Sequence, residues 1–218
     1  MSSEARQAIL DSIRTHLAAS VPYDNQVNHE ENPVILAKTT SDVSLVDLFK
    51  QRVEAVNGHG IIVNTDTDIA DVLTRIITDL KAQRLAVSEN PEVERLLQLT
   101  DLEIEELGIA PDSKDIFRFD VGITTVQAAI AETGTLVLDS TQERHRLVSL
   151  VPPVHIAILD ASKIYETLGE ALAFIHKTEI SPAVTFITGP SRTADIELTL
   201  TVGVHGPQEL YVIINGST

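Results

Sequence analysis

The sequence predicts an α/β protein with a mainly parallel sheet and helices on both faces, and two observations support this prediction. From about residue 34 onwards, short runs of β-branched and aliphatic residues alternate with stretches whose apolar residues recur every three or four positions. The strand-like runs are apolar throughout, which is typical of strands that are buried on both faces. With 218 residues and 43% hydrophobic content, the chain is long and apolar enough for one such domain.

The first segment predicts a helical appendage. Residues 4–19 carry apolar side chains at helical spacing, namely Ala5, Ala8, Ile9, Ile13 and Leu17. Residues 20–33 are polar and contain two prolines, as a connector does. We therefore expect a helix and linker over residues 1–33 and the α/β domain over residues 34–218. The helix either packs along the domain or docks to a partner subunit.

The remaining elements follow in order along the chain. Strands are predicted at residues 60–64, 84–88, 134–138, 155–159, 184–187 and 210–214. Helices are predicted at residues 42–56, 163–177 and 192–202, and between the first two strands, where Ile69, Val72, Leu73, Ile76, Ile77 and Leu80 form an apolar stripe. Thr65 or Asp66 is suited to cap that helix, and Pro91 to begin the next one. The first two strands and the helix between them predict a βαβ unit.

Composition excludes several classes of function. The chain has no cysteine, so it cannot form disulfides, use a thiol nucleophile or hold zinc or an iron–sulfur cluster through thiolates. Its net charge of −16 opposes binding to nucleic acid and to anionic lipid. No apolar run approaches the roughly 20 residues that span a bilayer. We expect a cytoplasmic protein with no metal site, because no metal-binding histidine or aspartate motif occurs either.

Ligand crevices of open α/β sheets lie beyond the carboxyl ends of the strands, which draws attention to residues 184–197. There a strand, a Gly189-Pro190 turn and hydroxyl residues precede the predicted helix at residue 192. The start of such a helix, with Ser191, Arg192 and Thr193, would bind an anion. Alternatively, Ser191 or Thr193 merely caps the helix while Asp195 lies in its first turn and pairs with Arg192.

A second group of polar residues leads into the strand predicted at 134–138. Glu132, Thr133, Gly134 and Thr135 would combine a carboxylate, hydroxyls and close backbone approach to a ligand. The alternative is a tight helix-to-strand turn with Gly134 at positive φ and Glu132 in solvent.

Two further features concern basic residues. Arg144-His145-Arg146 is the only dense basic cluster of this acidic chain and suits a small anion, unless it only neutralises nearby carboxylates. His205 precedes the last predicted strand, where a lone histidine is more often structural than catalytic.

Three strings of sequence are similar to a known family. They are residues 131–138, residues 146–156, and residues 189–197 together with Gly203-Val204-His205-Gly206-Pro207. They resemble the LUD-domain proteins, in particular the lactate utilization protein C (LutC/YkgG) group, and the similarity is dense from about residue 117 to the C-terminus. The resemblance implies a sheet of the NagB/RpiA/CoA-transferase type.

The resemblance also implies a function. The chain would serve beside two iron–sulfur proteins, LutA-like and LutB-like, in oxidising L-lactate to pyruvate for growth on lactate. It would itself carry no cofactor. The expected ligand-binding residues are Thr133, Gly134, Thr135, Arg146, Gly189, Ser191, Arg192, Thr193 and Asp195. Glu132 and His205 are the expected catalytic residues, as proton carriers.

A different class of function stays open beside this one. A stand-alone enzyme of the CoA-transferase or formyltetrahydrofolate cyclo-ligase type would act on a phosphorylated or acyl-CoA substrate. It would bind phosphate at the same helix start. Whether the chain is itself catalytic is left open by the sequence.

Overall fold

The computed structural model describes residues 3–19, 43–141, 145–175, 182–194, 200–202 and 206–216. The chain divides into two compact units, Met1–Ser41 and Asp42–Thr218. The border that the sequence predicts between appendage and domain, at residues 33 and 34, lies outside the described residues.

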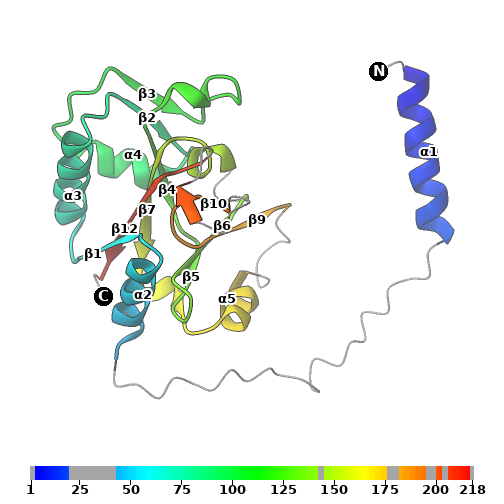
Figure 1. Cartoon of the computed structure of the whole chain (residues 1–218). Coiled ribbons are helices and arrows are strands. Elements are labelled where there is room, and N and C mark those ends of the chain that lie inside the picture. Colours follow the sequence, from blue (N-terminus) through cyan, green and yellow to red (C-terminus); the bar gives the residue numbers. More distant parts are fainter. Residues whose placement is uncertain are drawn as a thin grey trace. The chain divides into compact units, whose positions relative to one another are not determined.

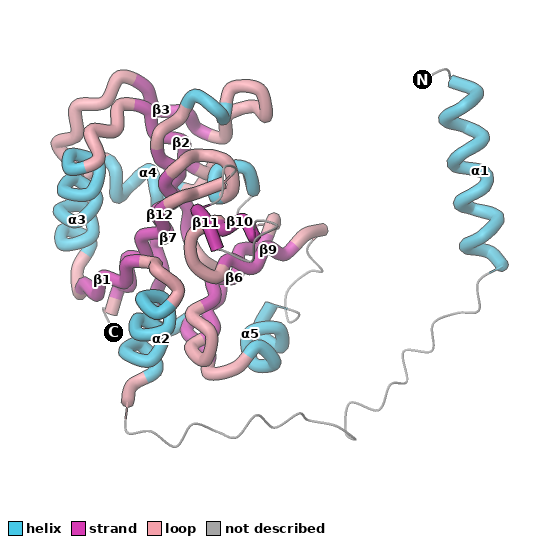
Figure 2. Tube along the Cα trace, viewed as in Figure 1, coloured by secondary structure: helices cyan, strands magenta, loops and turns pink. Residues whose placement is uncertain are grey.

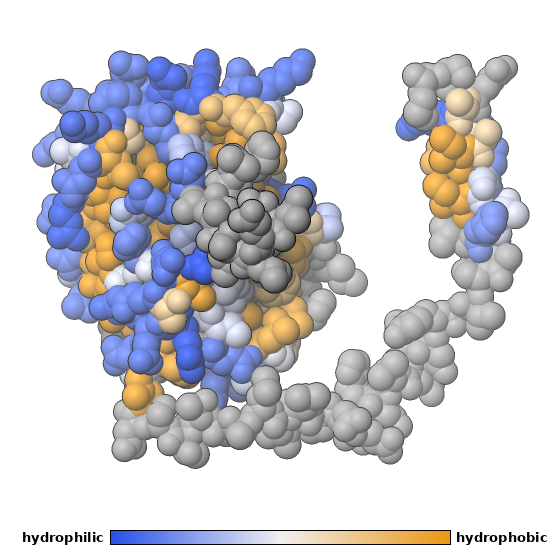
Figure 3. Space-filling view, in the orientation of Figure 1, coloured by the Kyte–Doolittle hydropathy of each residue, from blue (hydrophilic) through white to orange (hydrophobic). Residues whose placement is uncertain are grey.

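The first unit contains helix α1 (Ser3–Ala19), which confirms the predicted helical appendage. Ile9, Leu10 and Ile13 are exposed on it, and Figure 3 shows apolar side chains gathered along one side of this helix. Across the described parts of the chain, no helix combines the length and the apolar character needed to span a bilayer.

The second unit is built on a six-stranded sheet in which all paired strands are parallel (Figures 1 and 2). Its strands, in spatial order, are β1 (His59–Val63), β12 (Glu209–Asn215), β7 (Val154–Asp160), β4 (Val121–Thr125), β2 (Arg84–Val87) and β3 (Glu106–Ile109). The mainly parallel sheet is therefore confirmed. The predicted βαβ unit is only partly right: β1 and β2 are joined through a helix, but β12, β7 and β4 lie between them.

Helices α3 (Asp66–Asp79) and α4 (Pro91–Leu97) cover one face of this sheet (Figure 1). Thr65 Oγ1 accepts a hydrogen bond from the Asp68 amide at 3.1 Å, as predicted for the cap of α3. Asn90 caps α4, with Pro91 in its first turn. The apolar stripe of α3 packs on buried residues of the sheet, among them Ile123 and Ile156.

The opposite face is covered by helix α2 (Leu45–Ala55) and by a second sheet. This sheet has the order β8 (Ile164–Tyr165), β5 (Ala128–Ile130), β6 (Thr135–Asp139) and β9 (Val184–Ile187). Helix α5 (Leu168–Ile175) packs on its outer face, through Ala171 and Ile175. Helices thus lie on both sides of the molecule, as predicted, but a sheet that was not predicted forms much of the second layer (Figure 1).

Three short 3₁₀ helices lie in the connections: η1 (Ile116–Arg118), η2 (Arg146–Ser149) and η3 (Ala161–Lys163). The helix predicted over residues 163–177 was placed too early, because η3 and β8 precede α5. Thr167 and Glu170 explain where α5 begins. Thr167 Oγ1 accepts from the Glu170 amide, and Glu170 Oε2 accepts from the Glu166 and Thr167 amides, so the pair forms a capping box.

The helix predicted over residues 192–202 is wrong. Strand β10 (Arg192–Ala194) pairs antiparallel with β11 (Leu200–Val202). The sequence of residues 198–202, Leu-Thr-Leu-Thr-Val, alternates apolar and polar residues and is β-branched at three of five positions. This is the period and composition of a strand, and it outweighs the helical pattern on which the prediction for residues 192–202 rests. The helix start expected to bind an anion therefore does not exist.

Gly134 gives a test of the packing between α2 and the second sheet. It has φ +66°, and a Cβ atom there would lie 2.6 Å from backbone atoms of Arg52 and Val53. We expect Gly134→Ala to lower the free energy of unfolding by at least about 2 kcal/mol, from backbone strain and the clash with α2. Denaturant unfolding measures this.

Gly169→Ala is the matched control. Gly169 lies in α5, and its nearest neighbour to a new Cβ is Thr167 Oγ1 at 3.9 Å. This variant should gain up to about 1 kcal/mol from helix propensity. Equal effects of the two substitutions would contradict the proposed close contact.

Candidate functional site

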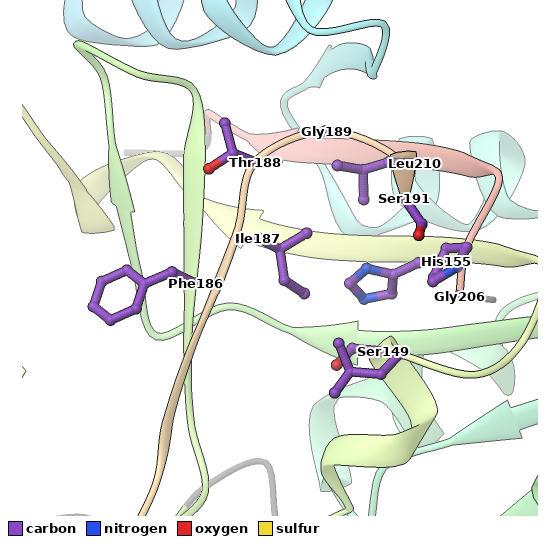
Figure 4. Close-up of a pocket in the computed structure, with 11 residues that line it drawn as sticks. Ser149, His155, Phe186, Ile187, Thr188, Gly189, Ser191, Gly206 and Leu210 are labelled. Carbon is purple, nitrogen blue, oxygen red and sulfur yellow. The ribbon is translucent and has the colours of Figure 1, made fainter. Parts of the chain in front are cut away.

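A pocket of about 360 Å³ lies beside the amino ends of β7 and β12 and the carboxyl end of β9 (Figure 4). It is lined by Ser149, Leu150, His155, Phe186, Ile187, Thr188, Gly189, Ser191, Gly206, Pro207 and Leu210. We call it the His155 pocket. The sequence predicts a ligand crevice at the carboxyl ends of the strands; this pocket lies at the carboxyl end of β9 and at the amino ends of the two central strands.

Gly122 shows how the chain folds around this pocket. In the central sheet His155 is in register with Gly122 of β4 on one side and with Leu210 of β12 on the other. A Cβ atom at Gly122 would lie 1.9 Å from the Val148 carbonyl oxygen. Only a residue without a side chain therefore lets η2 pack onto the sheet here and bring Ser149 to the pocket.

The other walls are held by backbone hydrogen bonds and close contacts. The Ser191 amide donates to the Pro207 carbonyl at 2.7 Å, which joins the two segments flanking the β10–β11 pair. Gly189 has φ +75°, and a Cβ atom there would lie 2.6 Å from the Val56 carbonyl oxygen. The turn after β9 thus packs against the end of α2.

His155 is the most unusual residue of the pocket. It is fully buried, and its Nε2 lies 2.9 Å from Thr124 Oγ1. Its Nδ1 has no hydrogen-bond partner among the described residues. Burial lowers the pKa of His155 to about 3, since desolvation disfavours the charged imidazolium. The ring is therefore neutral at physiological pH, and its Nδ1 is a buried polar atom without a partner among the described residues.

A second hollow, which we call the Arg146 hollow, has a volume of about 490 Å³. It is lined by Pro111, Asp112, Ser113, Ser140, His145, Arg146, Leu147 and Ala183. A cavity of about 10 Å³, roughly the space of one water molecule, has Ser140, His145 and Arg146 in common with this hollow and Ser149 in common with the His155 pocket. Arg146 is exposed and forms no ion pair with another described residue.

The residues predicted before the strand at 135–139 lie outside both hollows. Glu132, Thr133 and Gly134 lie in the hairpin turn between β5 and β6, and Thr135 begins β6. The predicted tight turn with Gly134 at positive φ is confirmed, but the element before it is a strand and not a helix. Glu132 Oε1 accepts from the Leu168 amide at 3.2 Å, at the start of α5. Thr135 Oγ1 lies 2.7 Å from Thr133 Oγ1 and 2.8 Å from Thr188 Oγ1. Thr135 is thus hydrogen-bonded to Thr188, which lines the His155 pocket.

The residues predicted after β9 separate into three groups. Gly189 and Ser191 line the His155 pocket. Arg192 is exposed, and its guanidinium donates to the Val56 carbonyl at 3.0 Å. Thr193 belongs to β10, and its side chain, like Asp195 and His205 as a whole, lies outside what the structure describes.

His155 and Thr124 are not among the residues that the sequence predicts for a site. The available signal was a histidine within the otherwise apolar run Val154-His155-Ile156-Ala157-Ile158-Leu159. A polar side chain in a strand buried on both faces needs a partner or a function.

Over the described part of the chain, no three histidine or acidic side chains are placed to hold a metal ion.

These features define an α/β protein in which a pocket whose described lining carries no charge lies at the parallel sheet, with an arginine-containing hollow nearby. Residues 46–215 match the LUD domain model, so the chain belongs to the LUD domain family. It is 29% identical over 182 residues to a lactate utilization protein C of Anoxybacillus flavithermus, covering 80% of this chain and 82% of that protein. A lactate utilization protein C of Geobacillus thermodenitrificans is 32% identical over 181 residues, which cover 80% of this chain and 70% of that protein.

A crystal structure of a DUF162 family protein from Deinococcus radiodurans shares the fold. The TM-score is 0.62 at 22% sequence identity, and the alignment covers 79% of this chain and 96% of the other.

The pKa of His155 predicts a pH dependence of stability. Below the ordinary pKa of about 6.5 the unfolded state binds a proton that the folded state does not bind until about pH 3. The free energy of unfolding therefore falls as pH decreases through this window. Between pH 7.5 and pH 5.0 the wild type should lose about 2 kcal/mol more than His155→Gln, which carries no titrating group there.

Urea unfolding of both proteins at the two pH values measures this difference. The other titrating groups are common to both and cancel in the comparison. Parallel pH profiles would show that His155 is protonated in the folded protein as readily as in the unfolded one.

Proposed function

We propose that this chain takes part in the use of L-lactate, as a component without redox centres of a system that oxidises lactate to pyruvate. The observation that carries this proposal is the similarity to proteins named lactate utilization protein C along 80% of the chain. The LUD domain match over residues 46–215 supports it.

The absence of cysteine points to the partners. Lactate oxidation releases electrons, and a chain without thiols offers no thiolate ligands for an iron–sulfur cluster. We propose that LutA-like and LutB-like iron–sulfur proteins receive these electrons in the cytoplasm, while this chain contributes a binding surface or a ligand site. In this proposal the chain carries no cofactor of its own.

The Arg146 hollow is the proposed place for a small anionic ligand. Its guanidinium is exposed and makes no ion pair with a described residue, and Ser113, Ser140 and His145 add hydrogen-bonding groups around it. A guanidinium binds a carboxylate through two parallel hydrogen bonds. The exposed Arg146 guanidinium supports a carboxylate of the size of lactate or pyruvate at this place, and the described lining also contains the carboxylate of Asp112.

The helix start that the alternative function requires is absent, because residues 192–194 form a strand. A stand-alone enzyme acting on a phosphorylated or acyl-CoA substrate was expected to bind phosphate at a helix start near Ser191. That segment leads into β10, and the Arg192 guanidinium contacts the Val56 carbonyl.

Growth on L-lactate tests the proposed function. In a strain whose own copy of the gene is deleted, the wild-type chain should restore growth with L-lactate as the sole carbon source. Arg146→Ala should reduce that growth rate severalfold, because the carboxylate loses its charged partner. Arg75→Ala, which removes an exposed arginine from α3, should grow as the wild type does.

The same strains separate the parts of this proposal. Unchanged growth of the deletion strain on lactate would contradict the role in lactate use. Normal growth of Arg146→Ala would contradict only the ligand site. A tagged chain purified from lactate-grown cells should retain iron and acid-labile sulfide through its partners, and their absence would contradict the partner assignment.

A further inference from the structure

The described lining of the His155 pocket carries no formal charge. Leu150, Phe186, Ile187, Pro207 and Leu210 supply its apolar walls. The two described arginines of this region lie elsewhere, since Arg146 lines the neighbouring hollows and the Arg192 guanidinium donates to the Val56 carbonyl. An anion in this pocket would leave water without a cation to replace it, which is strongly unfavourable. The lining therefore favours an uncharged ligand.

The imidazole of His155 sets the polarity of the ligand. Figure 4 shows the ring between Ile187 on one side and Ser191 and Gly206 on the other. Among the described residues, Nε2 of the ring and Oγ1 of Thr124 are each other's hydrogen-bond partners. If the hydroxyl donates to Nε2, its proton is satisfied, and the proton of the neutral ring lies on Nδ1. This tautomer leaves a buried N–H donor without an acceptor.

We propose that the His155 pocket binds an uncharged, largely apolar ligand that presents a carbonyl oxygen to the Nδ1–H of His155. A carbonyl satisfies the buried donor without bringing a charge into the pocket. The rest of the ligand lies against the apolar walls, with the hydroxyls of Ser149, Thr188 and Ser191 at the edge. This site is distinct from the Arg146 hollow, and the inference holds whether or not the chain takes part in lactate use.

Three probes with one skeleton test the proposal on the full chain. They are 2-acetylnaphthalene, which has a carbonyl, 2-ethylnaphthalene, which has none, and 2-naphthoate, which is an anion. Amide chemical shifts of Ile187, Gly189 and Leu210 in the ¹⁵N-labelled protein report binding at the pocket. We expect 2-acetylnaphthalene to bind at least about fivefold more tightly than 2-ethylnaphthalene, because the latter leaves the Nδ1–H unpaired. It should also bind more tightly than 2-naphthoate.

Variants at His155 assign that preference to one atom. His155→Asn can place an amide N–H where Nδ1 stood, whereas His155→Leu places no donor there, and both lose the contact with Thr124. The preference for 2-acetylnaphthalene over 2-ethylnaphthalene should persist in His155→Asn and disappear in His155→Leu.

Several results would overturn the proposal. These are equal binding of the first two probes to the wild type, tightest binding of 2-naphthoate, no shift of the pocket amides with 2-acetylnaphthalene, or an unchanged preference in His155→Leu. The comparison of probes on the wild type decides the question even if neither variant folds.

Discussion

The burial of the parallel sheet on both faces is the constraint on which the rest of the structure depends. Helices α3 and α4 exclude water from one face, and α2 with the second sheet excludes it from the other. The central strands must therefore be apolar throughout, and any polar side chain within them must find a partner. His155 obeys this rule at Nε2, through Thr124, and departs from it at Nδ1. The candidate pocket is lined by His155, the residue whose Nδ1 has no partner among the described residues.

Two neighbouring hollows offer different chemistry for a physical reason. The His155 pocket is bounded by both sheets and by η2, and its described lining is uncharged. The Arg146 hollow lies beside the exposed guanidinium of Arg146. Water can solvate this charge when no ligand is bound. In our proposal these two places hold small molecules, and the chain, which has no cysteine, leaves electron transfer to other proteins.

Much of the fold could be predicted because its signals are local. The apolar stripe of α3, its cap Thr65 and the proline Pro91 at the start of α4 act within a few residues of the chain. The strand order could not be predicted, because the insertion of β12 between β1 and β7 depends on contacts between distant segments. The hairpin of β10 and β11 was missed although residues 198–202 alternate as a strand does.

The site was predictable only in part. Gly189 and Ser191 were predicted as ligand-binding residues at a helix start; they line the His155 pocket, but the helix start is absent. Glu132 has its carboxylate on the Leu168 amide, a contact 36 residues apart that no local pattern signals. His155 and Thr124 come together because neighbouring strands are in register, which only the sheet topology determines.

The protonation state of His155 tests the central claim most directly. Long-range ¹H–¹⁵N correlation spectra of the histidine rings distinguish a nitrogen that carries a proton from one that does not. The account predicts that His155 is neutral from pH 7.5 to pH 5.0, with the proton on Nδ1 and a bare Nε2 facing Thr124. A proton on Nε2, or a titration near pH 6.5, would contradict it.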